Sequence, residues 1–402
     1  MNASSPIFIV GTNRSGTTLL RLMLNAHSRI AIPEEATYFQ SQYDGVPTEQ
    51  WRTPALSSAA YRALVEDFVT STAAIHPELD APALIDRILN DGPHDLRRPY
   101  QLTLEAWART TGKARWGEKT PGNLFYVDVL QEMFPDAYFL YVVRDPRAGV
   151  ASMMNAPFFA DDVVFNAMSR QKHAEVGLRL LQTHVAPDHW MTIRYEDLTN
   201  RPEDTLLGIC ALIGEDYEPA MLQYHRTAAT YMKEEAVSSF NATATRPVTT
   251  ARIDAWRDQL SARDVAVIEA ICADEMARYG YSPTSPALSI DAHLELGLKK
   301  AYWGLQMLRN RHIREYTVKH PVFARLRHRY SESVPALRLP RRIADTIPSS
   351  LPTALPAAAL ESVRDFTASL SWTPSFFRRT EPKRQKSVSS RSEDPDRQPA
   401  SV

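Results

Sequence analysis

One stretch near the N-terminus, residues 6–24, does most to limit the folds open to this chain. It begins with the apolar run Pro6-Ile-Phe-Ile-Val10, passes through Gly11-Thr-Asn-Arg-Ser-Gly-Thr-Thr18, and continues with apolar residues at helical spacing. This order predicts a buried parallel strand, a loop and a helix. Because Gly11 and Gly16 can adopt positive φ, we expect backbone N–H groups of the loop to converge on an anion at the helix N-terminus.

The loop has the glycine spacing of a phosphate-binding P-loop, but Thr17 stands where that motif has lysine. P-loop kinases and NTPases use the lysine to hold the β- and γ-phosphates. The nearest cation here is Arg14, whose planar guanidinium can form charge-assisted hydrogen bonds to phosphate worth about 1.5–3 kcal/mol each. The loop is therefore expected to bind a phosphate-like group without requiring a metal, although a strand–loop–helix unit that binds nothing would show the same pattern.

Charge is distributed unevenly along the chain. The formal net charge is −1 over 402 residues, but residues 291–402 hold 20 Lys/Arg and 11 Asp/Glu, which leaves −10 on residues 1–290. An acidic body argues against specific nucleic-acid binding, whereas the basic end suits an anionic membrane surface or an acidic partner.

Cysteine usage and hydropathy set the expected compartment. Cys210 and Cys272 each lie in an apolar pattern of helical period, which predicts core thiols rather than a disulfide or a zinc site. No positively charged segment followed by an apolar run precedes the first strand, and no run of about 18 apolar residues occurs. A cytoplasmic protein, peripheral to a membrane at most, is expected.

The loop sequence also resembles a known family. Arg14-Ser-Gly-Thr-Thr-Leu, followed by Arg21-x-Met-Leu-x-Ala-His27, resembles the 5′-phosphosulfate loop of sulfotransferases that use 3′-phosphoadenosine-5′-phosphosulfate (PAPS), especially the branch with protein-tyrosine sulfotransferases and bacterial relatives. The resemblance implies an α/β fold of the P-loop type, in three layers, with a central, mainly parallel sheet flanked by helices. It also implies a set of loop residues that bind PAPS: Arg14, Ser15, Gly16, Thr17 and Thr18.

Two adjacent glutamates, Glu34 and Glu35, follow the next short apolar run. Residues just past the end of a parallel strand face the ligand crevice, although paired glutamates in such a loop are as often merely solvated. In the resembling family the second glutamate of such a pair is the catalytic base, which implies that role for Glu35.

The segment Trp116-Gly-Glu-Lys119 leads to Pro121 and Gly122, which predict a turn followed by a helix through Phe134. A lysine in a loop is usually a solvated charge. The resemblance implies instead that Lys119 stabilises the bridging oxygen as the sulfuryl group leaves. Cytosolic sulfotransferases with a histidine base carry it two residues after this lysine, where this chain has Pro121, so the comparison favours Glu35.

The run from Ala137 to Val143 is the clearest buried strand in the sequence, and it ends at Arg144. With Ser152 on the following helix, Arg144 resembles the pair that recognises the 3′-phosphate of PAPS. The alternative is an arginine paired with Asp145 and an exposed serine.

Later segments supply three further candidates. A strand predicted at residues 189–194 leads to Tyr195, which the resemblance places against the adenine, although a core tyrosine would fit the same pattern. In the polar run of residues 240–250, the resemblance implies that Arg246 closes over the 3′-phosphate. Ser239 is the nearest candidate for a serine that assists the leaving oxygen.

The chain divides into three expected parts. Residues 1–286 form the sulfotransferase domain, with residues 45–115 as a helical insertion covering the acceptor pocket. Residues 287–345 form a basic helical extension, and the amphipathic segment 294–316 within it either lies on an anionic surface or packs on the domain. Residues 346–402, rich in Pro, Ser and Ala, are expected to be mostly disordered.

These features together predict transfer of a sulfuryl group from PAPS to an acceptor hydroxyl, giving 3′,5′-ADP and a sulfate ester. Glu35 would take the acceptor proton, and Lys119 and Arg14 would stabilise the leaving phosphate, with no metal ligands. Two alternatives stay open, an ATP-dependent kinase with an unusual P-loop and a noncatalytic nucleotide-binding adaptor at a membrane. The acceptor is not indicated.

Overall fold

The computed structural model describes residues 5–36, 38–39, 58–156, 159–232, 246–286 and 288–302. The predictions for Ser239, for residues 40–57 and for residues 303–402 lie outside these ranges.

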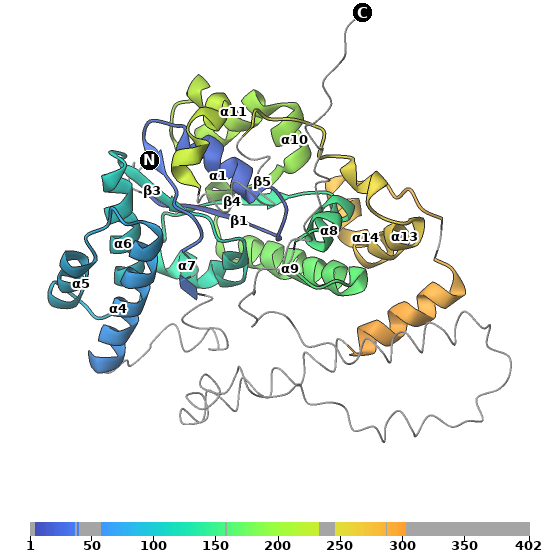
Figure 1. Ribbon diagram of the computed structural model, residues 1–402, viewed down its shortest axis with the longest axis horizontal. Helices are drawn as coiled ribbons and strands as arrows, with labels where there is room; N and C mark the ends of the chain where they lie inside the picture. The colour runs from blue at the N-terminus through green and yellow to red at the C-terminus, as the bar shows by residue number, and fades with distance from the viewer. Residues whose placement is uncertain are drawn as a thin grey trace, which may run out of the picture.

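A wholly parallel five-stranded sheet in the order β2-β3-β1-β4-β5 forms the centre of the protein (Figure 1). The predicted α/β class with a parallel sheet is confirmed. The strands are β1 (Ile7–Gly11), β2 (Ile30–Ala31), β3 (Arg115–Glu118), β4 (Tyr138–Val143) and β5 (Trp190–Arg194).

The two central strands, β1 and β4, are buried along their whole length. Their register pairs Ile7 with Tyr138 and Gly11 with Val142. Continuous apolar runs of this kind are typical of parallel strands that are covered on both faces. The loop that follows Gly11 therefore starts from a rigid position.

Alternation along β1 divides the core into two layers. Phe8 and Val10 join one apolar cluster with α4 (Ser58–Ile75), α6 (Arg97–Thr110), α7 (Val127–Met133) and α9 (Val163–His184). Ile7 and Ile9 join the other, with α1 (Thr17–Asn25), α10 (Tyr195–Asn200) and α11 (Pro202–Ile213). Figure 1 shows α1, α10 and α11 on one side of the sheet and α7 and α9 on the other.

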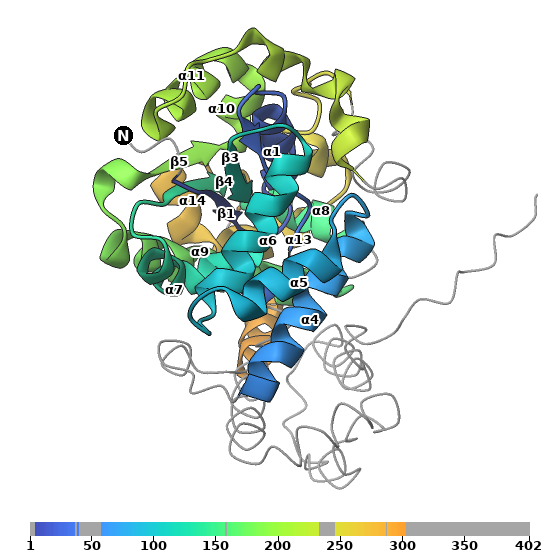
Figure 2. The ribbon, with the colours of Figure 1, turned by 90° about the vertical axis from the view of Figure 1, so that its left-hand side faces the viewer.

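Helices α4, α5 (Ala81–Asn90) and α6 lie together beside the β3 side of the sheet (Figure 2). The sequence pattern predicts helical stretches at residues 59–74 and 83–89, and α4 and α5 confirm them. Aromatic side chains join these helices to the sheet: the Tyr100 ring stacks on Tyr38 at 4.9 Å, and the Tyr38 hydroxyl donates to the Leu96 carbonyl at 2.9 Å. The segment after Glu35 is thereby fastened to the helical layer.

The segment 115–118 is a strand that the sequence analysis did not predict. The turn predicted at Pro121 and Gly122 is the 3₁₀ segment η1 (Pro121–Tyr126), and the helix predicted after it is α7. Strand β3 lacks the β-branched residues that mark a buried strand. Arg115 instead fills its buried position by donating to the carbonyls of Ser5 and Ile213 at 2.9 and 2.6 Å. Gly117 is needed because a Cβ at this position would lie 2.6 Å from the Ile7 carbonyl oxygen of the neighbouring strand.

The later helices also differ from expectation. The sequence pattern predicts a helix over residues 265–279, but the structure breaks it at Cys272 (φ −98°, ψ 19°) into α13 (Ala262–Ile271) and α14 (Ala273–Tyr279). It also predicts a helix over residues 253–260, where only the short 3₁₀ turn η6 (Ala255–Asp258) forms. The remaining elements are α8 (Pro146–Met154), η1 (Pro121–Tyr126), η2 (Pro187–His189), η3 (Pro219–Arg226) and η4 (Ala228–Tyr231).

Residues 290–302 are helical, in agreement with the start of the predicted segment 294–316. Ala292 and Leu296 are buried against the domain, and Lys299 Nζ lies 2.7 Å from the Asp162 carboxylate. This part of the extension packs on the domain through Lys299, in agreement with one of the two alternatives given for the segment. Both cysteines are free and buried, as predicted. Among the described residues, no helix combines the length and apolarity required to span a bilayer.

Close packing of α9 on η1 gives a test of this arrangement. A Cβ at Gly177 in α9 would lie 2.0 Å from Leu124 Cγ, whereas a Cβ at Gly208 in α11 would have open space. We expect Gly177→Ala to lower the free energy of unfolding by about 1–3 kcal/mol, because overpacking outweighs the gain of about 1 kcal/mol in helix propensity. Gly208→Ala should raise it by about 0.5–1 kcal/mol. Urea denaturation measures both, and equal shifts would contradict the packing.

Candidate functional site

The candidate site lies at the carboxyl edge of the sheet. Because all five strands are parallel, the residues that follow their ends are brought to one edge, where ligands of open α/β sheets bind. Each strand contributes one predicted residue or loop. In the spatial order of the sheet these are Glu35 after β2, Lys119 after β3, the Gly11–Thr18 loop after β1, Arg144 after β4 and Tyr195 after β5.

The loop after β1 is built to bring its backbone close to a ligand. Gly16 has φ 102°, and Arg14, at φ 62°, is the one non-glycine residue with positive φ among the residues described. Gly11 is required by the sheet, since a Cβ there would lie 2.5 Å from the Val142 carbonyl oxygen. The Ser15 hydroxyl is buried without a hydrogen-bond partner, and the first N–H groups of α1 have no acceptor within the helix. With the helix dipole, these donors favour an anion.

Arg14, Ser152 and Arg144 come together on one side of the loop. Arg14 Nε donates to Ser152 Oγ at 3.0 Å, and Arg144 Nη1 donates to the Arg14 carbonyl at 3.2 Å. Ser152 therefore contacts Arg14, whereas the resemblance implied that Ser152 and Arg144 together recognise the 3′-phosphate. The two arginines and the hydroxyl form one continuous polar surface.

Tyr195 packs against both the loop and Arg144. The Arg144 guanidinium carbon lies 4.3 Å from the centre of the Tyr195 ring, and a Cβ at Gly16 would lie 2.4 Å from Tyr195 Cδ2. Burial raises the pKa of the Tyr195 hydroxyl, while the charges of Arg144 and Arg252 lower it. The ring thus supports the loop directly, and its predicted contact with adenine stays a prediction.

Arg252 is a basic residue of this site that the sequence reasoning missed. Its carbonyl accepts a hydrogen bond from Arg144 Nη2 at 2.7 Å. Burial lowers the pKa of Arg14, and the positive charges of Arg144 and Arg252 lower it further. The predicted residue Arg246 has an exposed side chain, and its carbonyl accepts the Tyr224 hydroxyl at 2.6 Å. In the sequence, Arg252 could be found only as a second arginine, six residues after the predicted Arg246.

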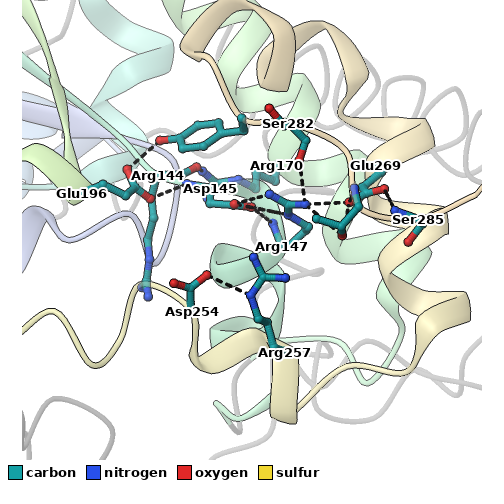
Figure 3. Close-up of polar contacts among 12 residues, drawn as sticks. Arg144, Asp145, Arg147, Arg170, Glu196, Asp254, Arg257, Glu269, Ser282 and Ser285 are labelled. Carbon is teal, nitrogen blue, oxygen red and sulfur yellow. Dashed lines mark hydrogen bonds and ion pairs between the residues drawn. The ribbon is translucent and has the colours of Figure 1, made fainter.

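A buried ionic cluster fixes the backbone next to Arg144 (Figure 3). Arg147 Nη2 lies 2.7 Å from the Asp145 carboxylate, and its Nη1 lies 2.6 Å from Glu269. The Glu196 carboxylate accepts the Asp145 backbone N–H at 3.0 Å. Asp145 is thus held by Arg147, which corrects the alternative that it pairs with Arg144. The side chain of Arg144 points away from this cluster in Figure 3.

Arg170 of α9 joins the loop to the end of β4. Its guanidinium donates to the carbonyls of Arg144 and Asn13, at 2.6 and 3.3 Å, and to the Glu275 carboxylate at 3.2 Å. A Cβ at Gly149 would lie 2.4 Å from Arg170 Nη1, so that glycine makes room for the guanidinium. Arg170 thus holds the backbone of the β1 loop beside the backbone at the end of β4. Nothing in the sequence around Arg170 predicts this role.

Glu35 and Lys119 meet on the other side of the loop. Lys119 Nζ donates to the Glu35 carboxylate, with Lys119 buried and the Glu35 side chain 44% exposed. The negative charge of Glu35 also acts on Arg14, where it opposes the lowering of that pKa. The candidate base, the candidate lysine and the loop cation therefore lie within electrostatic reach of one another.

Beside Glu35 is a cavity of about 190 Å³. Its wall is formed by the glutamate segment and by α4, with the residues Pro33, Glu34, Glu35, Ala36, Asp67, Phe68, Ser71, Thr72, Ile75 and His76. It offers polar groups beside an apolar surface. Among the residues described, no group of three or more His, Cys, Asp or Glu side chains is arranged to hold a metal ion.

Comparison with known proteins identifies the family. The sequence model described as the sulfotransferase family matches residues 6–219, which run from β1 to the start of η3. The chain belongs to the sulfotransferase family. Its predicted resemblance to that family is thereby confirmed.

Several curated sulfotransferases are similar to this member of the family. The mycobacterial omega-hydroxy-beta-dihydromenaquinone-9 sulfotransferase Stf3 (Mycobacterium tuberculosis) is 25% identical, over 71% of this chain and 77% of its own. Protein-tyrosine sulfotransferase 1 of Danio rerio is 25% identical, over 69% of this chain and 72% of its own. The nodulation protein NoeE of Sinorhizobium fredii is 24% identical, over 68% of this chain and 65% of its own.

Two sulfotransferases of known structure are similar to this chain at lower sequence identity than these relatives. A sulfotransferase domain of the curacin biosynthetic pathway is 20% identical, with a TM-score of 0.47, and covers 70% of this chain and 99% of that domain. Mouse sulfotransferase SULT7A1, solved with PAP, is 14% identical, with a TM-score of 0.39, and covers 69% of this chain and 86% of its own. The α/β fold of this chain follows from its own five-stranded parallel sheet.

Gly16 gives a test of the loop as an anion site. We expect Gly16→Ala to weaken binding of 3′,5′-ADP at least tenfold, because a Cβ would meet the Tyr195 ring at a backbone angle of φ 102°. Gly280→Ala is the matched control, since Gly280 also has positive φ (73°) but open space around it. Isothermal titration calorimetry measures both. Unchanged affinity in Gly16→Ala would exclude the loop from the anion site.

Proposed function

We propose that this sulfotransferase moves the sulfuryl group of PAPS to a hydroxyl of its acceptor, releasing 3′,5′-ADP. Membership of the family supports sulfuryl transfer. The observation that supports this donor and reaction most directly is the division of the site. The Glu35–Lys119 pair lies on one side of the β1 loop, and Arg144 and Ser152, which both contact Arg14 of the loop, lie on the other.

The residues present fit a donor with two separate phosphate groups. The loop donors and the unpartnered Ser15 hydroxyl suit the 5′-phosphosulfate. Arg144, whose Nε is also buried without a partner, suits a 3′-phosphate together with Arg252, whose positive charge acts on Arg14 and Tyr195. Burial and the positive charges of Arg144 and Arg252 lower the pKa of Arg14, so the three guanidinium groups repel one another. The negative charge of a bound phosphate would relieve this repulsion.

Proton removal falls to Glu35 in this proposal. Its carboxylate takes the proton of the acceptor hydroxyl as the hydroxyl oxygen bonds to sulfur. The bond between sulfur and the bridging oxygen breaks, and its electron pair stays with the departing 5′-phosphate. Lys119, Arg14 and the loop N–H groups stabilise that charge in a preorganised, largely buried site.

The cavity beside Glu35 is the proposed acceptor site. It lies between the proposed base and α4, which belongs to the segment expected to cover the acceptor. The similar proteins include a protein-tyrosine sulfotransferase and an omega-hydroxy-beta-dihydromenaquinone-9 sulfotransferase, and both names indicate a hydroxyl acceptor. We therefore propose a phenol or an alcohol as the acceptor of this chain.

Arg252 gives the test of the donor. We expect 3′,5′-ADP to bind at least tenfold more tightly than ADP, and Arg252→Ala to remove about tenfold of the 3′,5′-ADP affinity while ADP binding changes little. The reason is that one charge-assisted bond is worth about 1.5–3 kcal/mol. Arg278→Ala, at an exposed arginine that has no predicted role in the site, is the control and should change either affinity less than twofold. Calorimetry provides the affinities. Tighter binding of ADP, or of ATP with Mg²⁺, would favour a kinase instead.

Glu35 gives the test of the chemistry. We expect Glu35→Gln to lower kcat for transfer from labelled PAPS about 10²–10⁴-fold, because the amide accepts no proton, while the Kd of 3′,5′-ADP stays within threefold. The assay uses the best acceptor from a panel of phenols, sugars and primary alcohols. Unchanged turnover would remove Glu35 from the mechanism. Binding of 3′,5′-ADP with no transfer by the unaltered protein would favour a noncatalytic adaptor.

A further inference from the structure

Glu118 is a fully buried carboxylate that the proposed mechanism does not use. It is the last residue of β3, directly before Lys119, and it is 1% exposed. Burying a carboxylate is costly unless several donors surround it. The side chain therefore needs an explanation.

Four donors surround the Glu118 carboxylate. One oxygen, Oε2, accepts the Thr120 backbone N–H at 3.1 Å and the Asn123 side-chain amide at 2.5 Å. The other, Oε1, accepts the Ala36 backbone N–H at 3.3 Å and the Thr120 hydroxyl. The four donors come from two different segments of the chain.

These two segments carry the proposed catalytic pair. Ala36 directly follows Glu35, and Thr120 directly follows Lys119. The paired residues of β2 and β3 are Ile30 with Arg115 and Ala31 with Trp116, so the sheet itself ends before either catalytic residue. The Glu118 carboxylate continues the link between the two segments beyond the end of the sheet.

We propose that Glu118 is a positioning residue that sets the distance between Glu35 and Lys119 by holding the backbone just after each of them. This inference rests on the proposed function, in which those two residues act on the acceptor and the leaving group. A displacement of about 1 Å between reacting groups can lower a rate about 10²-fold. Loss of the link should therefore act on turnover more than on donor binding.

Only an ionised carboxylate satisfies all four contacts as an acceptor. Glutamine has the same size, but its amide nitrogen is a donor, so at least one contact would set a donor against a donor. An unmade hydrogen bond in a buried site disrupts the local arrangement. Glu118→Gln thus tests the link with little change in volume.

The pH dependence gives a second readout. Burial raises the pKa of Glu118 to about 7; the hydrogen bond from Thr120, the charge of Lys119 and the bond from Ala36 lower it, and Glu35 raises it. Tyr100, with its hydroxyl close to Asn123, also faces the carboxyl. Protonation turns one acceptor into a donor, so kcat of the unaltered protein should fall as pH drops below about 7. Glu118→Gln should lack this part of the fall.

The experiment compares Glu118→Gln with the unaltered protein, with kcat divided by the number of 3′,5′-ADP sites found by calorimetry. This division removes the effect of any unfolded fraction. We expect kcat per site to fall at least 30-fold, with the Kd of 3′,5′-ADP within threefold. Glu118→Asp keeps the acceptors on a shorter stem and should recover part of the loss.

Glu215→Gln is the matched control. The Glu215 carboxylate contacts Arg115, the first residue of β3, at 3.1 Å from Nη1, so this substitution also removes a buried charge beside β3. It should reduce stability and leave kcat per site within twofold. Equal kcat per site in Glu118→Gln and the unaltered protein would overturn the positioning role alone. An unaltered protein that binds 3′,5′-ADP and transfers nothing would overturn the proposed function, and this inference with it.

Discussion

The common direction of the five strands is the constraint on which the candidate site depends. Each strand ends at the same edge, and each places one polar segment there, although these segments are spread over residues 11–195. The strand order then determines which of these polar segments are neighbours. The β1 loop lies in the middle because β1 lies in the middle, with the acidic and lysine segments on one side and the arginine and tyrosine segments on the other. A change in strand order would separate these groups even if every residue were kept.

The threonine in place of the P-loop lysine fits the packing of this loop. Thr17 is buried, and its methyl group lies 3.4 Å from where a Cβ on Gly11 would be. The positive charge of the site is instead divided among side chains from other strands. Lys119 approaches from β3, and Arg144 approaches from β4 through the Arg14 carbonyl. A site assembled this way surrounds its ligand from several directions.

Sequence reasoning placed most of the candidate residues at strand ends because those signals are local. The glycines around the β1 loop, the apolar run before Arg144 and the paired glutamates each lie within a few residues of a strand, and the structure brings them to one edge of the sheet. The roles given to these residues came from the resemblance to the family. The misses share a physical cause. Arg170 holds Asn13 and Glu275, which are 157 and 105 residues away, and Glu118 holds Ala36, which is 82 residues away. Strand β3 is held by the buried Arg115 in place of β-branched side chains. Such long-range burial leaves no periodic pattern to find.

The contact between Lys119 and Glu35 has a consequence for the solvent around the site. In the proposed reaction Glu35 loses its negative charge to a proton at the stage when the departing phosphate gains one. In that proposal the Lys119 ammonium group contacts the departing phosphate as well as Glu35, and it exchanges one partner for the other with a small movement. The total charge of the pocket then stays nearly constant through the reaction, so the surrounding dipoles need little rearrangement.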